Sequence, residues 1–242
     1  MNISTVEVKN VTKCFDGHYV LVDVAFKINK GCILTIVGPN GSGKTTLAKI
    51  TAGLLNPTKG RIVINGEELS SSRRQFQSQI GLVIHETLLY EDLTTLENLK
   101  FYARLYGTKN YERQIKEILA TIGLEHKTNH RTKNLSRGMH QRLAIGRSMI
   151  PNPDFYIFDE PFTNLDFDST NAVVEIIKKL RDKGKLVLLT THNLEIASNI
   201  SDQILILHNG KICKALGKGT RFEDLEKTYI DLTSEIEPGI IT

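Results

Sequence analysis

A glycine-rich segment, Gly38-Pro-Asn-Gly-Ser-Gly-Lys-Thr45, contains the residue types that bind the phosphates of a nucleotide. It matches the P-loop pattern Gly-x-x-x-x-Gly-Lys-Thr in full, after an apolar run typical of a buried strand and before a helical pattern. Glycines let the backbone curl so that successive N–H groups point at phosphate oxygens, and the helix N-terminus adds partial positive charge. Lys44 would neutralise the β and γ phosphates, and the Thr45 hydroxyl would bind Mg²⁺. The segment predicts an ATP site formed by Gly38, Pro39, Asn40, Gly41, Ser42, Gly43, Lys44, Thr45 and Thr46.

A second chemical element follows the apolar segment Phe155-Tyr-Ile-Phe158, where the chain continues with Asp159 and Glu160. In a parallel strand, Asp159 would emerge at the carboxyl end, where the ligands of parallel sheets bind. Its carboxylate could coordinate Mg²⁺, and Glu160 is then placed to polarise an attacking water as a general base. An apolar run that ends in Asp-Glu is common by itself, so this interpretation depends on the P-loop in the same chain.

The segment Leu135-Ser-Arg-Gly-Met-His-Gln-Arg142 lies shortly before these carboxylates and opens a predicted helix. It resembles the signature motif of ABC-type ATPases, commonly Leu-Ser-Gly-Gly-Gln followed by a basic residue. Further likenesses to this family follow: Asn164-Leu165-Asp166 resembles its D-loop, and His192 resembles its switch histidine. Phe15 stands where the family places an aromatic residue that stacks on adenine.

The resemblance extends from Val6 to about Leu216 and implies a two-lobed domain that hydrolyses ATP as a head-to-tail dimer. ATP bound at Lys44 of one subunit would be covered by Ser136 and Gly138 of the other. A helix N-terminus with a serine hydroxyl and a glycine N–H suits a γ-phosphate. The nucleotide-binding set predicted in this way includes Phe15, Ser136, Gly138 and Asp166, and the catalytic set is Glu160, His192 and His85.

The chain departs from the family pattern at several positions. Arg137 and Met139 replace the usual first glycine and the glutamine of the signature, but Ser136 and Gly138 remain, so activity is expected to survive. His85 stands where the family usually has a glutamine that senses Mg²⁺ and the attacking water. A histidine can partly substitute because each ring nitrogen donates or accepts one hydrogen bond. The alternative is that water bridges the gap and His85 is incidental.

Three of the other assignments have plainer alternatives. Phe15 could be a core aromatic residue, and His192 could be a surface residue at a helix N-terminus. Asp166 could be the N-cap of the helix that follows it, and this role is compatible with a place in the dimer.

Strands and helices alternate along most of the chain, which predicts a parallel sheet covered on both faces. Thr5–Lys9 and Val20–Ile28 alternate apolar and polar residues and predict an antiparallel sheet near the N-terminus. Buried or partly buried strands are predicted at Ile33–Val37, Arg61–Ile64, Ile80–Ile84, Phe155–Phe158, Leu186–Thr190 and Gln203–Leu207. Helices are predicted at Thr46–Leu54, Leu96–Leu105, Tyr111–Thr121, Met139–Ile150 and Thr170–Leu180.

The fold class expected is therefore α/β: a P-loop NTPase core with a mostly parallel sheet, an N-terminal antiparallel β subdomain and an inserted helical lobe. We expect one domain over residues 1–242, with the core at about 1–84 and 146–220. The almost purely helical stretch of about 85–145 would be the lobe. Residues 221–242 mix charges with Pro238-Gly239 and are expected to form a peripheral tail.

Composition limits the classes of partner. The 31 Lys and Arg against 27 Asp and Glu leave a formal net charge of +4, too mild to indicate nucleic acid or an anionic membrane. The three cysteines are widely spaced without metal-ligand spacing, and they favour a reduced compartment. The N-terminus does not resemble a signal peptide, and no apolar run approaches the ~20 residues that cross a bilayer. Any membrane role is therefore expected to need a partner.

The function expected is that of a motor subunit of an ABC transporter, cytoplasmic and peripheral at the inner face of the cell membrane. It would drive a separate permease through contacts near Glu86–Leu105. Leu93–Leu99 with Asp159–Asp166 resembles haem-exporter ATPases of cytochrome c maturation, and Leu135–Met139 resembles ABC-2-type exporters. The rival is a soluble ABC ATPase of iron–sulfur cluster assembly without a permease. A regulatory subunit without turnover is a third reading, against which Glu160 and His192 argue.

Overall fold

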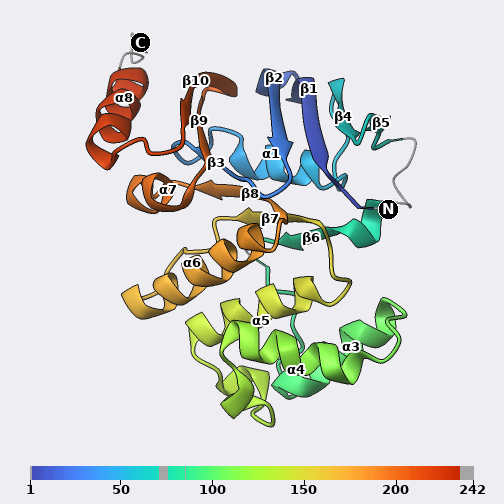
Figure 1. Cartoon of the computed structure of the whole chain (residues 1–242). Coiled ribbons are helices and arrows are strands. Elements are labelled where there is room, and N and C mark those ends of the chain that lie inside the picture. Colours follow the sequence, from blue (N-terminus) through green and yellow to red (C-terminus); the bar gives the residue numbers. More distant parts are fainter. Residues whose placement is uncertain (1, 71–75, 85, 235–242) are drawn as a thin grey trace.

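A six-stranded sheet carries the phosphate-binding segment at the carboxyl end of one of its central strands (Figure 1). The structure is a computed structural model and describes residues 2–70, 76–84 and 86–234. The strand order is β10-β9-β3-β8-β7-β6, parallel throughout except that β10 is antiparallel to β9. The strands are β3 (Ile33–Val37), β6 (Ile80–Val83), β7 (Phe155–Asp159), β8 (Leu186–Thr191), β9 (Gln203–His208) and β10 (Lys211–Gly217). Because β3, β7 and β8 are buried along their whole length, they read as continuous apolar runs.

The N-terminal strands form a separate antiparallel sheet with the order β2-β1-β4-β5. Its strands are β1 (Thr5–Phe15), β2 (His18–Asn29), β4 (Lys59–Ile64) and β5 (Glu67–Glu68). β1 and β2 are longer than the sequence predicted, and they pair from Thr5 opposite Asn29 to Phe15 opposite His18. The turn between them uses left-handed backbone at Asp16 and Gly17, with φ of 47° and 85°.

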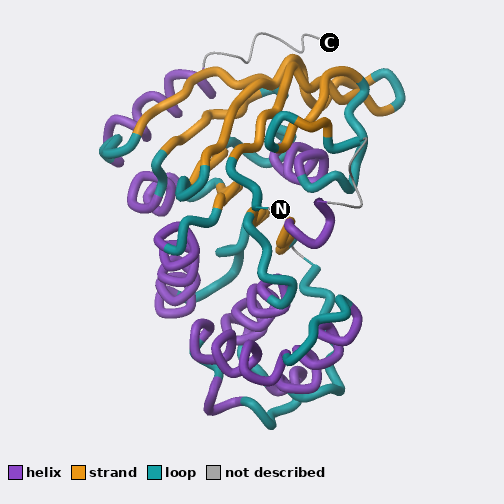
Figure 2. The backbone as a smooth tube through the Cα atoms, turned by 45° about the vertical axis from the view of Figure 1, so that its right-hand side comes forward, coloured by secondary structure: helices purple, strands orange, loops and turns teal. Residues whose placement is uncertain are grey.

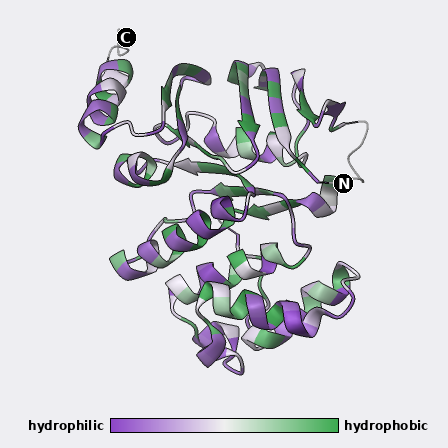
Figure 3. Cartoon of the chain, in the orientation of Figure 1, coloured by the Kyte–Doolittle hydropathy of each residue, from purple (hydrophilic) through white to green (hydrophobic). Residues whose placement is uncertain are grey.

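The helices divide between the sheets and a body of their own, which lies below the sheets in Figures 1 and 2. The α-helices are α1 (Lys44–Thr51), α3 (Thr95–Leu105), α4 (Tyr111–Ile122), α5 (Arg137–Met149), α6 (Phe167–Asp182), α7 (Leu194–Ile200) and α8 (Phe222–Ser234). Short 3₁₀ helices occur at η1 (Gln77–Gln79), η2 (Glu125–Lys127) and η3 (Thr132–Asn134). The body consists mainly of α3, α4 and α5, whose hydrophobic and hydrophilic residues are interleaved along each helix in Figure 3.

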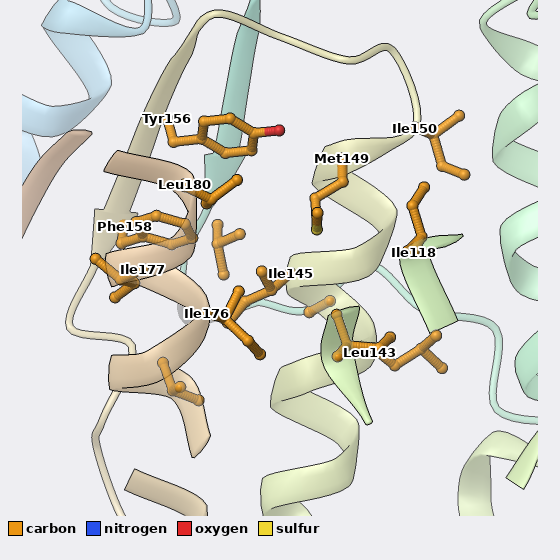
Figure 4. Packing of buried hydrophobic residues seen from close by; sticks show 14 of the residues in the cluster. Ile118, Leu143, Ile145, Met149, Ile150, Tyr156, Phe158, Ile176, Ile177 and Leu180 are labelled. Carbon is orange, nitrogen blue, oxygen red and sulfur yellow. The ribbon is translucent and has the colours of Figure 1, made fainter. Parts of the chain in front are cut away.

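The two faces of the six-stranded sheet have different cores. One face packs on α1 and the antiparallel sheet, so that α1 is enclosed between the two sheets. The other face packs on α5 and α6 (Figure 4): Tyr156 and Phe158 of β7 meet Ile177 and Leu180 of α6 and Met149 of α5. The boundary that we expected near residue 145 falls inside α5. This helix packs both on β6 of the sheet and on α4. The division of the chain into a core and a helical lobe remains a proposal.

The first part of the segment 221–242, which we expected as a peripheral tail, is helical. Residues Phe222–Ser234 form α8, and Leu225 of this helix is fully buried against a cluster that includes Val37, Ile204 and Ala197. The helix packs on α7 and β9, and the sequence predicted neither it, nor α7, nor β10 as an element. Residues 235–242 lie outside the described part of the chain.

Candidate active site

The segment 38–45 turns from β3 into α1 in a form that requires glycine at two positions. Gly43 has φ of 105°, and a Cβ there would lie 2.7 Å from Leu21 Cδ2 and 2.9 Å from the Val20 carbonyl oxygen. A Cβ at Gly38 would lie 2.2 Å from the Leu207 carbonyl oxygen. The turn encloses a cavity of about 350 Å³ that is lined by Val20, Asn40, Gly41, Gly43, Lys44, Thr45, Thr46 and Glu160. This cavity, called the cradle below, is thus formed mainly by the predicted phosphate-binding residues, and Glu160 forms part of its wall.

Lys44 holds a buried positive charge in this cavity, with 6% of its surface exposed. Its Nζ donates to the carbonyl oxygens of Gly38 at 2.7 Å and Pro39 at 3.1 Å. It also lies 3.3 Å from Glu160 Oε1 in an ion pair. The hydroxyl of Ser42 is buried beside it and has no hydrogen-bond partner among the described residues. A buried ammonium with oxygen partners on two sides and an unused hydroxyl is a ready binding place for an oxygen-rich anion.

Glu160 is held where the chain leaves β7, in the left-handed region with φ of 49°. For a residue with a Cβ this backbone costs on the order of 1 kcal/mol, so the neighbours must hold it. Its N–H donates to the Thr190 carbonyl oxygen at 3.1 Å and lies 3.2 Å from the Thr190 hydroxyl. Its second carboxylate oxygen, Oε2, lies 2.9 Å from His192 Nδ1. The Glu160 carboxylate therefore contacts both Lys44 and His192 at the carboxyl ends of β7 and β8.

Asp159 is the last residue of β7 and is almost fully buried. Its Oδ1 accepts a hydrogen bond of 2.5 Å from the Thr190 hydroxyl. The sequence analysis missed Thr190, which fixes both acidic residues from the neighbouring strand. A threonine in an otherwise apolar buried strand was the available signal, because a buried hydroxyl needs a partner.

The signature segment places its residues away from the cradle of the same chain. Ser136 is the N-cap of α5, and its hydroxyl accepts from the Met139 N–H at 3.3 Å. A Cβ at Gly138 would lie 2.0 Å from the Ser169 hydroxyl oxygen, so α6 requires a glycine there. Neither Ser136 nor Gly138 lines the cavity at Lys44. A second cavity of about 390 Å³ lies between this segment and Glu160, lined by Thr87, Leu135, Arg137, His140, Gln141, Glu160, Pro161, Thr163 and Leu165.

The remaining predicted residues lie as follows. Phe15 is at the end of β1 with 42% of its surface exposed, and Lys13 Nζ lies 4.7 Å from the centre of its ring. It is therefore not a core residue, and it does not line the cavity at Lys44. Asp166 is the N-cap of α6, where the Ser169 N–H donates to it at 2.7 Å and lowers the pKa of its carboxyl. His85 lies outside the described residues.

Metal and membrane features are limited in the described part of the chain. In residues 2–70, 76–84 and 86–234, no group of three or more histidine, cysteine, aspartate or glutamate side chains could hold a metal ion. Among the same residues, no helix is long and apolar enough to span a bilayer. The Thr45 hydroxyl belongs to a residue that lines the cavity, and the Asp159 carboxylate lies at the end of strand β7; oxygen donors of this type suit Mg²⁺.

The parallel sheet, the glycine turn and the acidic pair at the end of β7 define a P-loop ATPase. Residues 21–163 match the model of the family described as ABC transporter. The chain is 34% identical over 216 residues to the ABC transporter ATP-binding protein NatA of Bacillus subtilis (strain 168), a match that covers 86% of this chain and 88% of NatA. It is 32% identical to the Nod factor export ATP-binding protein I of Cupriavidus pinatubonensis, over 85% of this chain and 64% of that protein.

A solved structure agrees with this assignment. The dimeric post-hydrolysis state of the ATP-binding cassette MJ0796 bound to ADP and Pi superposes with a TM-score of 0.79 at 29% identity, over 88% of this chain and 98% of that one. The chain belongs to the ABC transporter family, as an ATP-binding subunit that hydrolyses ATP. The predicted fold class and enzyme class are confirmed, and the comparisons give no support to the iron–sulfur assembly alternative.

Proposed function

We propose that the subunit works as one half of an ATP-driven dimer that powers export through a separate membrane permease. The observation that carries this proposal is the arrangement of Lys44, Glu160 and His192 around the cradle, with Ser136 and Gly138 outside it. The cradle contains the candidate general base but lacks Ser136 and Gly138 of its own chain. A second copy of the chain could supply these two residues. The export direction is supported by the relative whose name describes export of Nod factor.

The proposed chemistry follows from the two contacts of Glu160. ATP phosphates in the cradle take the place of Glu160 as the partner of Lys44, because they carry more charge. The freed carboxylate then accepts a proton from a water that attacks the γ-phosphorus, while the bond from that phosphorus to the β–γ bridging oxygen breaks. His192, already 2.9 Å from Glu160 Oε2, keeps the carboxylate oriented or contacts the γ-phosphate. ADP and phosphate leave the site, and the proton leaves with the phosphate.

Mg²⁺ is assigned to the same site as part of the proposal. The Thr45 hydroxyl lines the cradle, and Asp159 keeps one carboxylate oxygen free of the Thr190 hydroxyl. When bound there, the ion would shield the charge of the β and γ phosphates. The Thr190 hydroxyl holds the Asp159 carboxylate at the end of β7, where it would serve as a ligand.

The trans contacts are proposed for Ser136 and Gly138 of the partner subunit. Both belong to the N-terminal turn of α5, which has no acidic residue in its first turn and so presents partial positive charge. Asp166, on the exposed loop that caps α6, would lie between the two subunits. Phe15 stays a proposal for adenine contact, supported by its exposure beside the cradle-forming strand β2.

The permease is proposed to dock on the exposed apolar face around α3. The most exposed apolar side chains of this region are Leu88, Tyr90, Phe101, Leu105 and Tyr106. The Tyr90 and Phe101 rings are 4.7 Å apart in an edge-to-face contact, so the patch is preformed. Leu89 and Leu93, which lie in the same segment, are only partly exposed, and Leu89 packs against the core of the lobe. This docking would place the subunit at the cytoplasmic side of the cell membrane.

Glu160→Gln tests the dimer directly. With ATP, this variant should accumulate as a dimer in size-exclusion chromatography with light scattering, because ATP binds but the general base is lost. Its turnover should fall by about 100-fold or more. A Glu160→Gln protein that stays monomeric at saturating ATP, or that turns over ATP at the wild-type rate, would refute the proposal. Expression beside the neighbouring genes tests the permease: the subunit should co-purify with a membrane protein.

A further inference from the structure

Arg147 carries a buried positive charge that has no carboxylate partner among the described residues. It lies in the last turn of α5 with 6% of its surface exposed. Its Nη2 donates to the Leu82 carbonyl oxygen at 3.2 Å, and its guanidinium carbon lies 5.2 Å from the centre of the Tyr102 ring. Its Nε has no acceptor in the part of the chain that the structure describes. Burial lowers the pKa of this guanidinium, which is the expected sign for a charge taken out of water.

These contacts connect three elements that the nucleotide cycle has to coordinate. Leu82 belongs to β6, at the edge of the six-stranded sheet, and Tyr102 belongs to α3, under the proposed docking patch. α5 and β6 are in close approach, because a Cβ at Gly81 would lie 3.1 Å from the Ser148 carbonyl oxygen. Arg147 is therefore a physical link from the helix that begins at Ser136 to both the sheet and α3.

The link continues to the segment before α3. The Tyr102 hydroxyl donates to the Leu88 carbonyl oxygen, and Leu88 has left-handed backbone with φ of 53°. The Tyr90 ring lies 6.4 Å from the Tyr102 ring and 4.7 Å from the Phe101 ring. Tyr102 thus contacts Arg147 on one side and the exposed apolar patch on the other.

Stability alone does not account for an arginine here. A buried guanidinium that has one carbonyl acceptor and one aromatic ring leaves donors unsatisfied, and a hydrophobic side chain of similar length often does as well or better in such a place. Tyr102, which the guanidinium contacts, belongs to the hydrophobic core of the lobe. The Leu82 carbonyl oxygen on β6 and the Tyr102 ring on α3 contact the guanidinium from two elements. These contacts restrict the orientation of α5 relative to both.

We infer that Arg147 is a positioning residue that makes α5 move with β6 and α3 as one unit, so that the signature end of α5 meets the partner's ATP in the right place. Loss of the guanidinium lets α5 take several orientations relative to the sheet. ATP then still binds to the cradle, but closure of the dimer becomes less favourable. This inference rests on the proposed dimer and adds the residue that couples the docking patch to it.

The chain supplies a matched control on the same helix. Arg142 is also a partly buried arginine of α5 whose pKa burial lowers, and among the described residues its Nε likewise has no acceptor. Its Nη1 donates to the carbonyl oxygens of Ile122 at 2.8 Å and Gly123 at 3.3 Å, the last residue and the C-cap of α4. Arg142 therefore links α5 to α4 only, whereas Arg147 links α5 to the sheet.

The experiment compares Arg147→Met with Arg142→Met in the Glu160→Gln background. Three quantities are measured: the midpoint of thermal unfolding, the affinity for ADP, and the ATP concentration that gives half-maximal dimer. ADP affinity should stay within about twofold in both variants, because neither arginine lines the cavity at Lys44. The ATP concentration for half-dimerisation should rise about tenfold for Arg147→Met, a size typical of coupling energies, and by less than about threefold for Arg142→Met.

The outcomes separate the inference from its basis. Equal dimerisation midpoints for the two variants, at comparable thermal midpoints, overturn the positioning role. A parental Glu160→Gln protein that stays monomeric with ATP overturns the proposed dimer and this inference together. If Arg147→Met does not fold, Arg147→Lys and Arg142→Lys replace the pair: Lys keeps a charge but lacks the planar fork, so the same order of effects is expected at smaller size.

Discussion

Lys44 shows how one side chain can be prepared for a ligand by the contacts it makes without it. Two backbone carbonyl oxygens and Glu160 hold the ammonium in the cradle, at distances of 2.7, 3.1 and 3.3 Å. The charge is in place before a nucleotide arrives, so little side-chain entropy is lost on binding.

The first prediction follows from this preorganisation. Lys44→Ala should weaken nucleotide binding by about 10- to 100-fold, the size expected for one charge-assisted contact. A titration with a fluorescent ATP analogue measures this affinity. Lys49→Ala, in the last turn of the same helix, is the control and should bind as the wild type does. Unchanged affinity for Lys44→Ala would contradict the phosphate-binding assignment.

His140 gives a second prediction at this scale. Burial lowers the pKa of this imidazole below 6.5, although the charge of Glu91 opposes the shift. The folded chain therefore binds fewer protons here than the unfolded chain, and this contribution to stability is full above about pH 6.5 and is lost as the pH falls below it. His140→Gln should flatten the pH dependence of the unfolding free energy between about pH 7.5 and 5, measured by urea denaturation. His18→Gln, in the exposed β1–β2 hairpin, serves as the control, and identical pH profiles for His140→Gln and wild type would refute the assignment.

At the scale of elements, α5 and α6 approach so closely that one residue on each decides their distance. Gly138 faces Ser169, and a methyl group on Gly138 would overlap the Ser169 hydroxyl at 2.0 Å. Gly138→Ala should therefore destabilise the fold by about 1–3 kcal/mol through overpacking. Combining it with Ser169→Gly should recover part of that loss, because the overlapping atoms are removed. Chemical denaturation of the single and double variants measures the coupling, and additive effects would contradict the proposed clash.

Elements with a strong pattern could be predicted from the sequence, and those defined by tertiary contacts could not. The runs at Ile33–Val37 and Phe155–Asp159 are apolar throughout because both faces of the sheet are covered, so their pattern is clear. α8 has a weaker signal: among its described residues only Leu225 is fully buried, and its surface is charged. Its place is decided by packing on α7 and β9, which no local pattern reveals.

The same reasoning applies to the site. The P-loop and the Asp159–Glu160 pair are sequence-local, since neighbouring residues supply the chemistry. Thr190 and Arg147 were missed because each acts through a contact distant in sequence, with Asp159 and Leu82 respectively. Arg147 in particular reads as an ordinary polar position of an amphipathic helix until the fold places it against β6.

At the scale of the whole molecule, the proposed docking face and the cradle lie in different bodies of the chain (Figure 1). The acidic residues beside the apolar patch are not equivalent. Asp92 forms an ion pair with Lys133 at 2.8 Å, which lowers the pKa of the Asp92 carboxyl, whereas no ion pair of Glu91 is found among the described residues. Reversal of charge at Asp92 would disturb the fold locally, so Glu91 is the cleaner site for a test of docking.

Glu91→Lys should leave the ATPase activity of the isolated subunit unchanged and should reduce its co-purification with the membrane partner. The reason is that Glu91 lies at the rim of the apolar patch and away from the cradle. Glu226→Lys, on α8, is the control for a change of net charge alone. If Glu91→Lys and Glu226→Lys co-purify with the membrane fraction as well as the wild type does, the α3 face is not the docking surface.

The ion pair between Lys44 and Glu160 has a further consequence for the affinity of the site for nucleotides. The Glu160 carboxylate is a tethered competitive inhibitor: it occupies the anion position of the cradle at a high effective concentration, and any nucleotide must displace it. Glu160→Gln removes the competitor's charge, so the variant should bind ADP about fivefold more tightly, a change of about 1 kcal/mol. Because ADP is not hydrolysed, isothermal titration with ADP reports this competition free of any effect on turnover, and an unchanged ADP affinity would show that the pair is too weak to matter. A subunit built in this way binds little nucleotide at low concentration, and the group that competes with the nucleotide is the one that we propose as the proton acceptor.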